Sequence, residues 1–339
     1  MAGSLARLPA PVGSRCSRRL PITLPRRQNR RQSCIGSRVV ESWSPLDAEL
    51  GHALSAAGGV DFSRAEARPV GGGCIHRAQE VRAGERRYFL KMNDAAALPM
   101  FEAEVDGLDA LARCDAFRVP RPLACGMAGA RAFLLLEYLD LRPLATDEDG
   151  QRFARALVQL HHDIGEHYGW ARDNFIGANP QANTPRDGWA QFFIKHRLMP
   201  QLQMARAKGF GGALGRDADQ LIERVPALFL EYCPRPSLLH GDLWNGNAAM
   251  DAEGRPAIFD PAVYRGDRDA DLAMSELFGG FPAAFYVAYR TAWPLAEGYE
   301  QRKTLYNLYH VLNHLNLFGR GYLGQAERMI RALFFELRR

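Results

Sequence analysis

The sequence predicts an α+β protein of two lobes: a small, β-rich N-terminal lobe with one main helix and a larger, mainly helical C-terminal lobe. Strand-like runs separated by glycine turns lie between residues 68 and 139, and apolar residues at helical spacing dominate the chain beyond residue 150. The chain after residue 40 is long enough for two lobes that share a cleft. We therefore expect a leader over residues 1–40, an N-lobe over 41–139 and a C-lobe over 140–339.

Residues 1–40 have a composition of their own. They hold nine arginines and no Asp, Glu or Lys, which leaves 34 basic against 38 acidic residues in the rest of the chain. An arginine-rich, acid-free leader is typical of an organelle transit peptide, and a translated upstream stretch without a role can have the same composition. No aromatic residue interleaves with the arginines, which disfavours a nucleic-acid-binding arm. We expect this leader to be disordered and to carry the apparent basic charge.

Cysteine usage and hydropathy restrict the compartment. Six cysteines show no C-x-x-C pair and no zinc spacing, and no apolar run approaches the roughly 18 residues of a membrane helix. A reducing compartment is the simplest interpretation, with neither a membrane nor nucleic acid as a partner. We expect a cytoplasmic protein or, if residues 1–40 are a transit peptide, one in a plastid or mitochondrion.

The segment from Arg68 to Asn93 predicts a nucleotide-binding hairpin. A run of three glycines between apolar residues could turn tightly and bring backbone N–H groups close to phosphates; it consists of Gly71, Gly72 and Gly73. Ala83-Gly84-Glu85 predicts a hairpin turn before a strand with one lysine, Lys91, which we expect to contact the phosphates of ATP. The segment lacks a P-loop motif. Cys74 follows the glycines, where it is either an oxidisable thiol or a small buried residue.

Apolar spacing predicts a helix from Pro99 to Arg113. Glu104 lies in this helix and could hold Lys91 by an ion pair, with Glu102 and Asp106 as rivals. A solvated acidic face is the alternative interpretation of these carboxylates.

A buried strand over Ala132–Asp140 turns polar at its end and predicts a hinge between the lobes. We expect main-chain groups of Glu137 and Leu139 to contact the adenine ring there. Beyond the hinge, apolar residues spaced by four, three and four predict the first helix of the C-lobe; they are Phe153, Leu157, Leu160 and Ile164.

The most informative motif is Leu238–Asn247, LLHGDLWNGN, followed by Ile258-Phe259-Asp260. Asp242 and Asn247 have the D-x-x-x-x-N spacing in which an Asp receives the proton of an attacking hydroxyl and an Asn oxygen holds a metal ion. Asp260 ends a short apolar strand and is the expected second ligand, and such oxygen ligands with ATP phosphates suit Mg²⁺. His240 is expected to hydrogen-bond the loop backbone, with direct proton transfer as the alternative. The pattern indicates phosphoryl transfer.

At this point the sequence resembles the fructosamine kinase, or ketosamine 3-kinase, family. The resemblance rests on HGDLWNGN, IFDPAVYRGDRDADLAMSELFGGF, GGGCI, FLKMN, FEAEV and YGWARDNFIG, and it extends from about Trp43 to the C-terminus. It implies a protein-kinase-like fold shared with aminoglycoside phosphotransferases and ATP-dependent phosphorylation of the 3-hydroxyl of sugars joined to amines by glycation, which leads to deglycation. Members of the family place a cysteine at the position of Cys74. Asn245 departs from the serine common at its position.

Two residues are expected on the acceptor side. Trp244 can lie on the same side as Asp242 and place its indole against the cationic amine of a ketosamine. The alternative is that this indole packs under the loop that carries Asp242. His314 could reach the sugar, although a purely structural role is the alternative, and with His310 it lacks the Glu of a zinc motif. The expected partners are glycated proteins or small ketosamines, and the expected state is a monomer or weak dimer.

Two other function classes are compatible with parts of this pattern. Another small-molecule kinase of the same fold would act on an aminoglycoside, choline or a sugar, and the ATP site alone does not exclude it. A catalytically inactive scaffold is disfavoured because Lys91, Asp242, Asn247 and Asp260 are all present.

Overall fold

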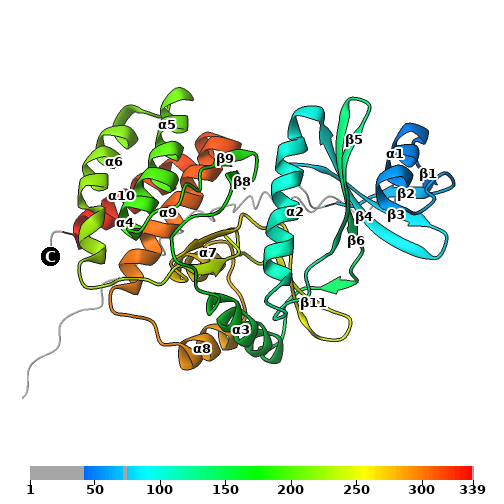
Figure 1. Ribbon diagram of the computed structural model, residues 1–339. Helices are drawn as coiled ribbons and strands as arrows, with labels where there is room; N and C mark the ends of the chain where they lie inside the picture. Colours follow the sequence, from blue (N-terminus) through cyan, green and yellow to red (C-terminus); the bar gives the residue numbers. More distant parts are fainter. Residues whose placement is uncertain (1–41, 72–74, 338–339) are drawn as a thin grey trace, which may run out of the picture. The chain divides into compact units, whose positions relative to one another are not determined.

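A six-stranded antiparallel sheet forms the first part of the fold (Figure 1). In the computed structural model, which describes residues 42–71 and 75–337, the strand order is β1-β2-β3-β4-β6-β5. The strands are β1 (Ser44–Pro45), β2 (Glu66–Pro69), β3 (Arg77–Ala83), β4 (Arg86–Asp94), β5 (Pro122–Ala128) and β6 (Arg131–Glu137). The predicted turn joins β3 to β4, and Gly84 has the positive φ of 62° that favours glycine.

Side chains of this sheet point alternately to its two faces, and a helix packs on each face. Tyr88 and Leu90 of β4 belong to the apolar cluster that contains α1 (Ala48–Gly58). Phe89 packs instead with the cluster that contains α2 (Leu98–Ala112), which matches the helix expected over residues 99–113. A period of two along β4 therefore places Lys91 on the α2 side of the sheet.

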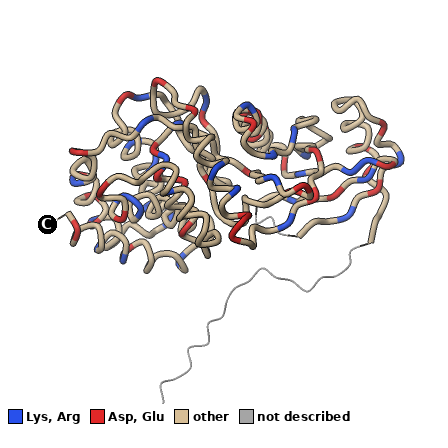
Figure 2. Tube along the Cα trace, turned by 90° about the horizontal axis from the view of Figure 1, so that it is seen from below, with Lys and Arg blue, Asp and Glu red and all other residues tan. Residues whose placement is uncertain are grey.

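The rest of the described chain is mainly helical. Its α-helices are α3 (Asp147–His161), α4 (Trp189–Phe193), α5 (Met199–Ala207), α6 (Gly212–Arg224), α7 (Asp269–Leu277), α8 (Ala283–Ala292), α9 (Tyr299–Phe318) and α10 (Leu323–Glu336). A π-helical segment, Ile194–Leu198, joins α4 to α5, and 3₁₀ turns lie at Val225–Phe229 and Arg320–Tyr322. A further 3₁₀ turn, Ala95–Ala97, precedes α2 in the first part of the fold. Charged residues of both signs are interspersed along the described chain (Figure 2).

Short strands position the loops of the C-lobe. They are β7 (Leu141–Arg142), β8 (Asn174–Ile176), β9 (Asn179–Gln181), β10 (Ser237–Leu239), β11 (Ala248–Asp251), β12 (Pro256–Ile258) and β13 (Tyr264–Gly266). β10 pairs with β13, and β11 lies between β7 and β12. These pairings bring segments that are distant in sequence to one place.

One helix boundary differs from the prediction. Thr146 caps α3 through the N–H of Asp149, but the helix ends at His161, so Ile164 lies outside it. Ile164 instead forms a β-bridge with Ser237, the first residue of β10. Long-range strand pairing thus overrides the apolar spacing.

Some predicted features fall on residues that the structure does not describe. Gly72, Gly73, Cys74 and the leader over residues 1–40 are among them. Gly71 is described and is exposed between β2 and β3. Within the described ranges, no helix is long and apolar enough to cross a membrane.

Candidate active site

Asp242 lies in a loop, His240–Asn247, that connects β10 to β11 and that we term the catalytic loop. The Nδ2 of Asn247 donates to the backbone oxygen of Asp242 at 3.0 Å and to its Oδ2 at 3.2 Å. The Oδ1 of Asp242 has no hydrogen-bond partner within residues 42–71 and 75–337 and is thus available to an incoming hydroxyl. Gly241 has a φ of 82°, and a Cβ there would lie 2.0 Å from the oxygen of Ala262, so this tight turn needs glycine.

Asp260 joins this loop through the β11–β12 pairing. Ala248 lies opposite Ile258, and the N–H of Phe259 donates to the oxygen of Asn247 at 3.2 Å. Asp260 then adopts a left-handed φ of 57°, an uncommon conformation that Asp tolerates better than most residues. The same Nδ2 of Asn247 lies 3.4 Å from the backbone oxygen of Asp260. The predicted base and both predicted metal ligands are therefore neighbours.

These residues fit an oxygen-liganded cation. Asn247 uses its nitrogen within the loop, which leaves its Oδ1 without a partner among the described residues, and the side chain of Asp260 is 49% exposed. The described ranges contain no group of three or more His, Cys, Asp or Glu that could hold a metal alone. Two protein oxygens that are completed by phosphate and water oxygens suit Mg²⁺.

Lys91 is buried between two carboxylates. Its Nζ lies 2.5 Å from Oε1 of Glu104 and also contacts Oδ1 of Asp260. Burial lowers the pKa of Lys91, but Asp260 and Glu104 outweigh burial and raise it above its ordinary value, so the lysine stays charged. The predicted Lys91–Glu104 pair is present in the structure. The rivals of Glu104 have other partners: Asp106 accepts from Nε1 of Trp170 at 2.6 Å, and Glu102 faces Arg172.

The environment of Asp242 makes it a better base than a free carboxylate. Burial and the nearby charge of Asp260 raise its pKa to about 7, against the hydrogen bond from Asn247 that lowers it. A carboxylate whose pKa is close to neutral can accept a proton from a hydroxyl more readily than an ordinary aspartate can. This electrostatic setting supports the role predicted for Asp242.

His240 orients the catalytic loop, as the sequence predicted. Its Nδ1 accepts from the N–H of Asp242 at 3.2 Å, and its Nε2 lies 3.0 Å from the oxygen of Phe259. Burial lowers its pKa, so the ring is neutral and its Nε2–H donates to Phe259. His240 therefore connects the loop to the segment that carries Asp260.

Asp271 is an important residue that sequence reasoning missed. Its two carboxylate oxygens accept from the N–H groups of His240 at 2.7 Å and of Gly241 at 2.9 Å. Hydrogen bonds from His161 and from the loop outweigh burial and lower the pKa of Asp271, so it is ionised. The available signal was the run Asp267-Arg268-Asp269-Ala270-Asp271, which places carboxylates at the start of a helix.

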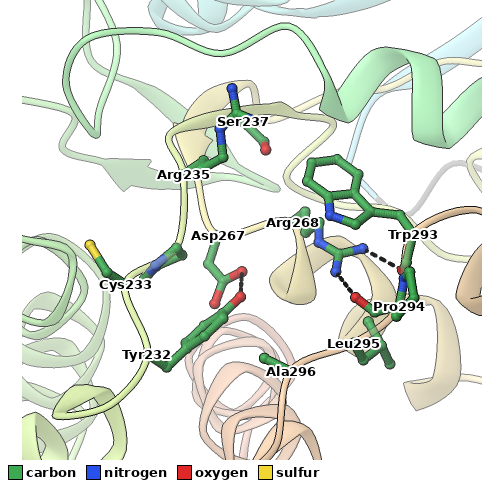
Figure 3. A pocket seen from close by; sticks show the side chains of 11 residues that line it. Tyr232, Cys233, Arg235, Ser237, Asp267, Arg268, Trp293, Pro294, Leu295 and Ala296 are labelled. Atoms are coloured by element: carbon green, nitrogen blue, oxygen red, sulfur yellow. Dashed lines mark hydrogen bonds between the residues drawn. The ribbon is translucent and has the colours of Figure 1, made fainter.

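The start of α7 is itself anchored on several sides (Figure 3). Tyr232 donates to Asp267 at 2.9 Å, and Arg268 donates to the oxygens of Trp293 and Pro294 at 3.0 and 2.6 Å. Arg302 forms a buried ion pair with Asp269 at 3.0 Å. These contacts fix the helix that presents Asp271 to the catalytic loop.

Three aromatic rings pack together where the catalytic loop carries Trp244; they belong to Trp244, Phe278 and His314. We term this group the acceptor wall, because Trp244 and His314 are the predicted acceptor-binding residues. The ring of Phe278 lies 6.1 Å from that of Trp244 and 4.7 Å from that of His314. The indole also lies over Gly246, where an added Cβ would be 2.3 Å from the ring. The structure thus brings the two predicted acceptor residues to one wall through Phe278, which the sequence analysis missed.

The hinge agrees with the prediction only in part. The N–H of Glu137 donates to the oxygen of Arg121 at 2.9 Å, and its carboxylate contacts Arg118. That N–H is therefore not open to adenine, and the backbone oxygen of Glu137 and the main chain of Leu139 are the remaining candidates.

Comparisons with known proteins found relatives over most of the chain. A family model described as fructosamine kinase matches residues 47–336. The "Probable ketoamine kinase" of Synechocystis is 45% identical over 279 residues, which cover 82% of this chain and 93% of that protein. The "Protein-ribulosamine 3-kinase, chloroplastic" of Arabidopsis thaliana is 38% identical over 264 residues, which cover 77% of this chain and 80% of that protein.

Solved structures agree as well. A Haemophilus somnus protein assigned as a fructosamine-3-kinase has a TM-score of 0.75 at 30% identity, with 84% of this chain and 96% of that chain covered. A thermostable mutant of an aminoglycoside phosphotransferase, solved with AMP-PNP and hygromycin B, has a TM-score of 0.56 at 17% identity over 78% of this chain and 93% of that one, a likeness of fold alone. The predicted two-lobed, protein-kinase-like α+β fold is confirmed.

Proposed function

The chain belongs to the fructosamine kinase family and is a kinase, and from this premise we propose that it transfers the γ-phosphoryl group of ATP to the 3-hydroxyl of ketosamines. The observation that carries the proposal is the convergence of Lys91, Asp242, Asn247 and Asp260 in one site. Ribulosamine and fructosamine adducts, on proteins or on free amines, are the proposed acceptors. The 3-phosphate that forms is expected to eliminate and thereby release the amine.

Each residue has a defined part in the proposed reaction. The acceptor oxygen attacks the γ-phosphorus, the bond from that phosphorus to the bridging oxygen of ADP breaks, and Oδ1 of Asp242 takes the hydroxyl proton. Lys91, held by Glu104, contacts the phosphates. Asn247 and Asp260 would hold Mg²⁺, which when bound neutralises phosphate charge. His240 and Asp271 keep the catalytic loop in place.

The acceptor wall supports a ketosamine as the substrate. A ketosamine carries a secondary amine that is cationic near neutral pH, and an indole face attracts such a cation by about 0.5–2 kcal/mol. Burial lowers the pKa of His314, so the wall carries no competing positive charge. The sugar hydroxyls would lie between this wall and Asp242.

Another small-molecule kinase activity is the second candidate, because aminoglycoside phosphotransferases share the fold. ATP turnover should be measured with a ribulosamine, a fructosamine, choline and kanamycin, with Asp242→Asn as the inactive control. We expect turnover of one or both ketosamines and none of choline or kanamycin. Robust kanamycin turnover without ketosamine turnover would refute the proposal.

A further inference from the structure

A second cavity, of about 630 Å³, lies away from the catalytic loop, and we term it the outer cavity. It lies where β4 and β5 begin and β6 ends, beside the segment that follows α1. Phe62 and Leu135 line it, and both belong to the apolar cluster on the α1 side of the sheet. The side chain of Lys91 projects from the other face of β4, so the outer cavity is distinct from the active site.

Three arginines give this cavity a positive rim. Arg86 and Arg121 are exposed, and their guanidinium groups have no hydrogen bond or ion pair within residues 42–71 and 75–337. Arg87 contacts Asp140 and lies 4.4 Å above the ring of Tyr138. Glu137, the acidic residue that lines the cavity, is paired with Arg118. Two guanidinium groups are therefore available to bind an anion.

Tyr88 adds an aromatic ring to the lining of the outer cavity. The residue is only 5% exposed, and its hydroxyl is enclosed by protein, without a hydrogen-bond partner among the described residues. A ligand in the cavity would therefore contact the ring of Tyr88 and not its hydroxyl.

The smaller pocket in Figure 3, of about 260 Å³, shows the contrast. Two of its charged groups are already used inside the protein, because Asp267 accepts from Tyr232 and Arg268 donates to two backbone oxygens. Among the described residues that line it, Arg235 is its one charged side chain without a partner, whereas the outer cavity offers two.

We propose that the outer cavity binds a small organic phosphate, a compound with a phosphate group on an apolar or aromatic body. Guanidinium forks match the geometry of phosphate oxygens, and the apolar floor with Phe62 and Leu135 would receive the body. The cavity volume lies within the range of small-molecule sites. Glu137 and Tyr138 line it and immediately precede Leu139 at the hinge, so its occupancy is expected to alter nucleotide affinity, and nucleotide to alter its occupancy by the same factor.

Phenyl phosphate is a suitable probe, titrated calorimetrically into the full chain saturated with AMP-PNP and Mg²⁺ so that the nucleotide site is filled. We expect saturable binding that is at least about tenfold tighter than that of inorganic phosphate or phenol. Arg86→Gln/Arg121→Gln should weaken phenyl phosphate at least about tenfold, because hydrogen bonds to charged groups are lost. In the absence of AMP-PNP, the same titration should give a changed affinity that reports the coupling.

The matched control is Arg113→Gln/Arg216→Gln, which removes two exposed arginines that do not line the outer cavity. Its affinity for phenyl phosphate should stay within about twofold of wild type, which excludes a general charge effect. Equal losses in both double variants, or no saturable binding up to about 10 mM, would overturn the proposal. If inorganic phosphate bound as tightly as phenyl phosphate, the proposal that the ligand is an organic phosphate would be wrong.

Discussion

The two sides of the active site are built from different chemistry. On the nucleotide side, Lys91 is a buried cation between two carboxylates, Glu104 and Asp260. On the acceptor side, Trp244, Phe278 and His314 form a wall of rings without charge. In the proposed reaction, the charges that would attract metal and phosphate are positioned by ion pairs, whereas the acceptor would meet a surface that is positioned by ring packing. The difference implies that variants on the two sides should change different kinetic constants.

The largest expected effect comes from Asp242, the proposed base. Asp242→Asn keeps the shape of the side chain but removes the proton acceptor, so kcat should fall by roughly 10²–10⁴-fold. ATP affinity, measured by calorimetry, should stay within a few-fold because this carboxylate does not anchor the nucleotide. Turnover above about a tenth of wild type would correspond to a loss under 1.4 kcal/mol and would contradict the base assignment.

Asp260 tests the nucleotide side. Asp260→Asn tolerates the left-handed backbone at this position but removes the charged metal ligand. We expect ATP affinity in the presence of Mg²⁺ to fall at least about tenfold, with kcat reduced as well. The same titration without Mg²⁺ is the control, and it should show a much smaller change. An equal loss with and without the ion would mean that Asp260 does not act through a metal.

Trp244 tests the acceptor side. Trp244→Leu removes the indole face, so the KM for a ribulosamine should rise several-fold, in line with about 0.5–2 kcal/mol for a cation over an aromatic ring. The KM for ATP serves as the internal control and should change less. An unchanged ribulosamine KM in a folded variant would show that Trp244 only packs under the loop.

The last expected effect is on stability and concerns His310, a buried histidine one helical turn before His314 in α9. Burial lowers the pKa of His310 to about 3, below its ordinary 6.5, so the folded protein resists its protonation. The stability that depends on neutral His310 is present above pH 6.5 and is lost progressively as the pH falls below it. From pH 7.5 to 5, the free energy of unfolding should fall less in His310→Gln than in wild type, by roughly 1–2 kcal/mol. Denaturant titrations at both pH values measure the free energy of unfolding. An equal fall between the two pH values in wild type and His310→Gln would contradict the prediction.

Local patterns in the sequence predicted the main elements of the N-lobe and the positions of the residues that meet around the catalytic loop. The hairpin at Gly84, the helix with Glu104 and the order Asp242, Asn247, Asp260 each depend on short-range spacing. Their convergence could be expected because the catalytic motif and the following strand lie close in sequence.

Long-range contacts account for what the sequence did not predict. Asp271 accepts a hydrogen bond from Gly241, which lies 30 residues earlier in the sequence. The ring of Phe278 contacts those of Trp244 and His314, and these two residues lie in different parts of the fold. No spacing rule identifies such partners. The bridge between Ile164 and Ser237 also depends on a distant strand. Apolar spacing alone therefore extends the predicted helix past His161, where α3 ends.

Gly246 has a consequence for engineering this enzyme. It carries no reactive group, yet the indole of Trp244 lies so close that even one methyl group there would collide with the ring. Gly246→Ala would therefore force the indole to a new position and change the shape offered to the acceptor. Directed-evolution libraries that aim to broaden acceptor range should randomise this position together with residue 244, because each limits what the other can become.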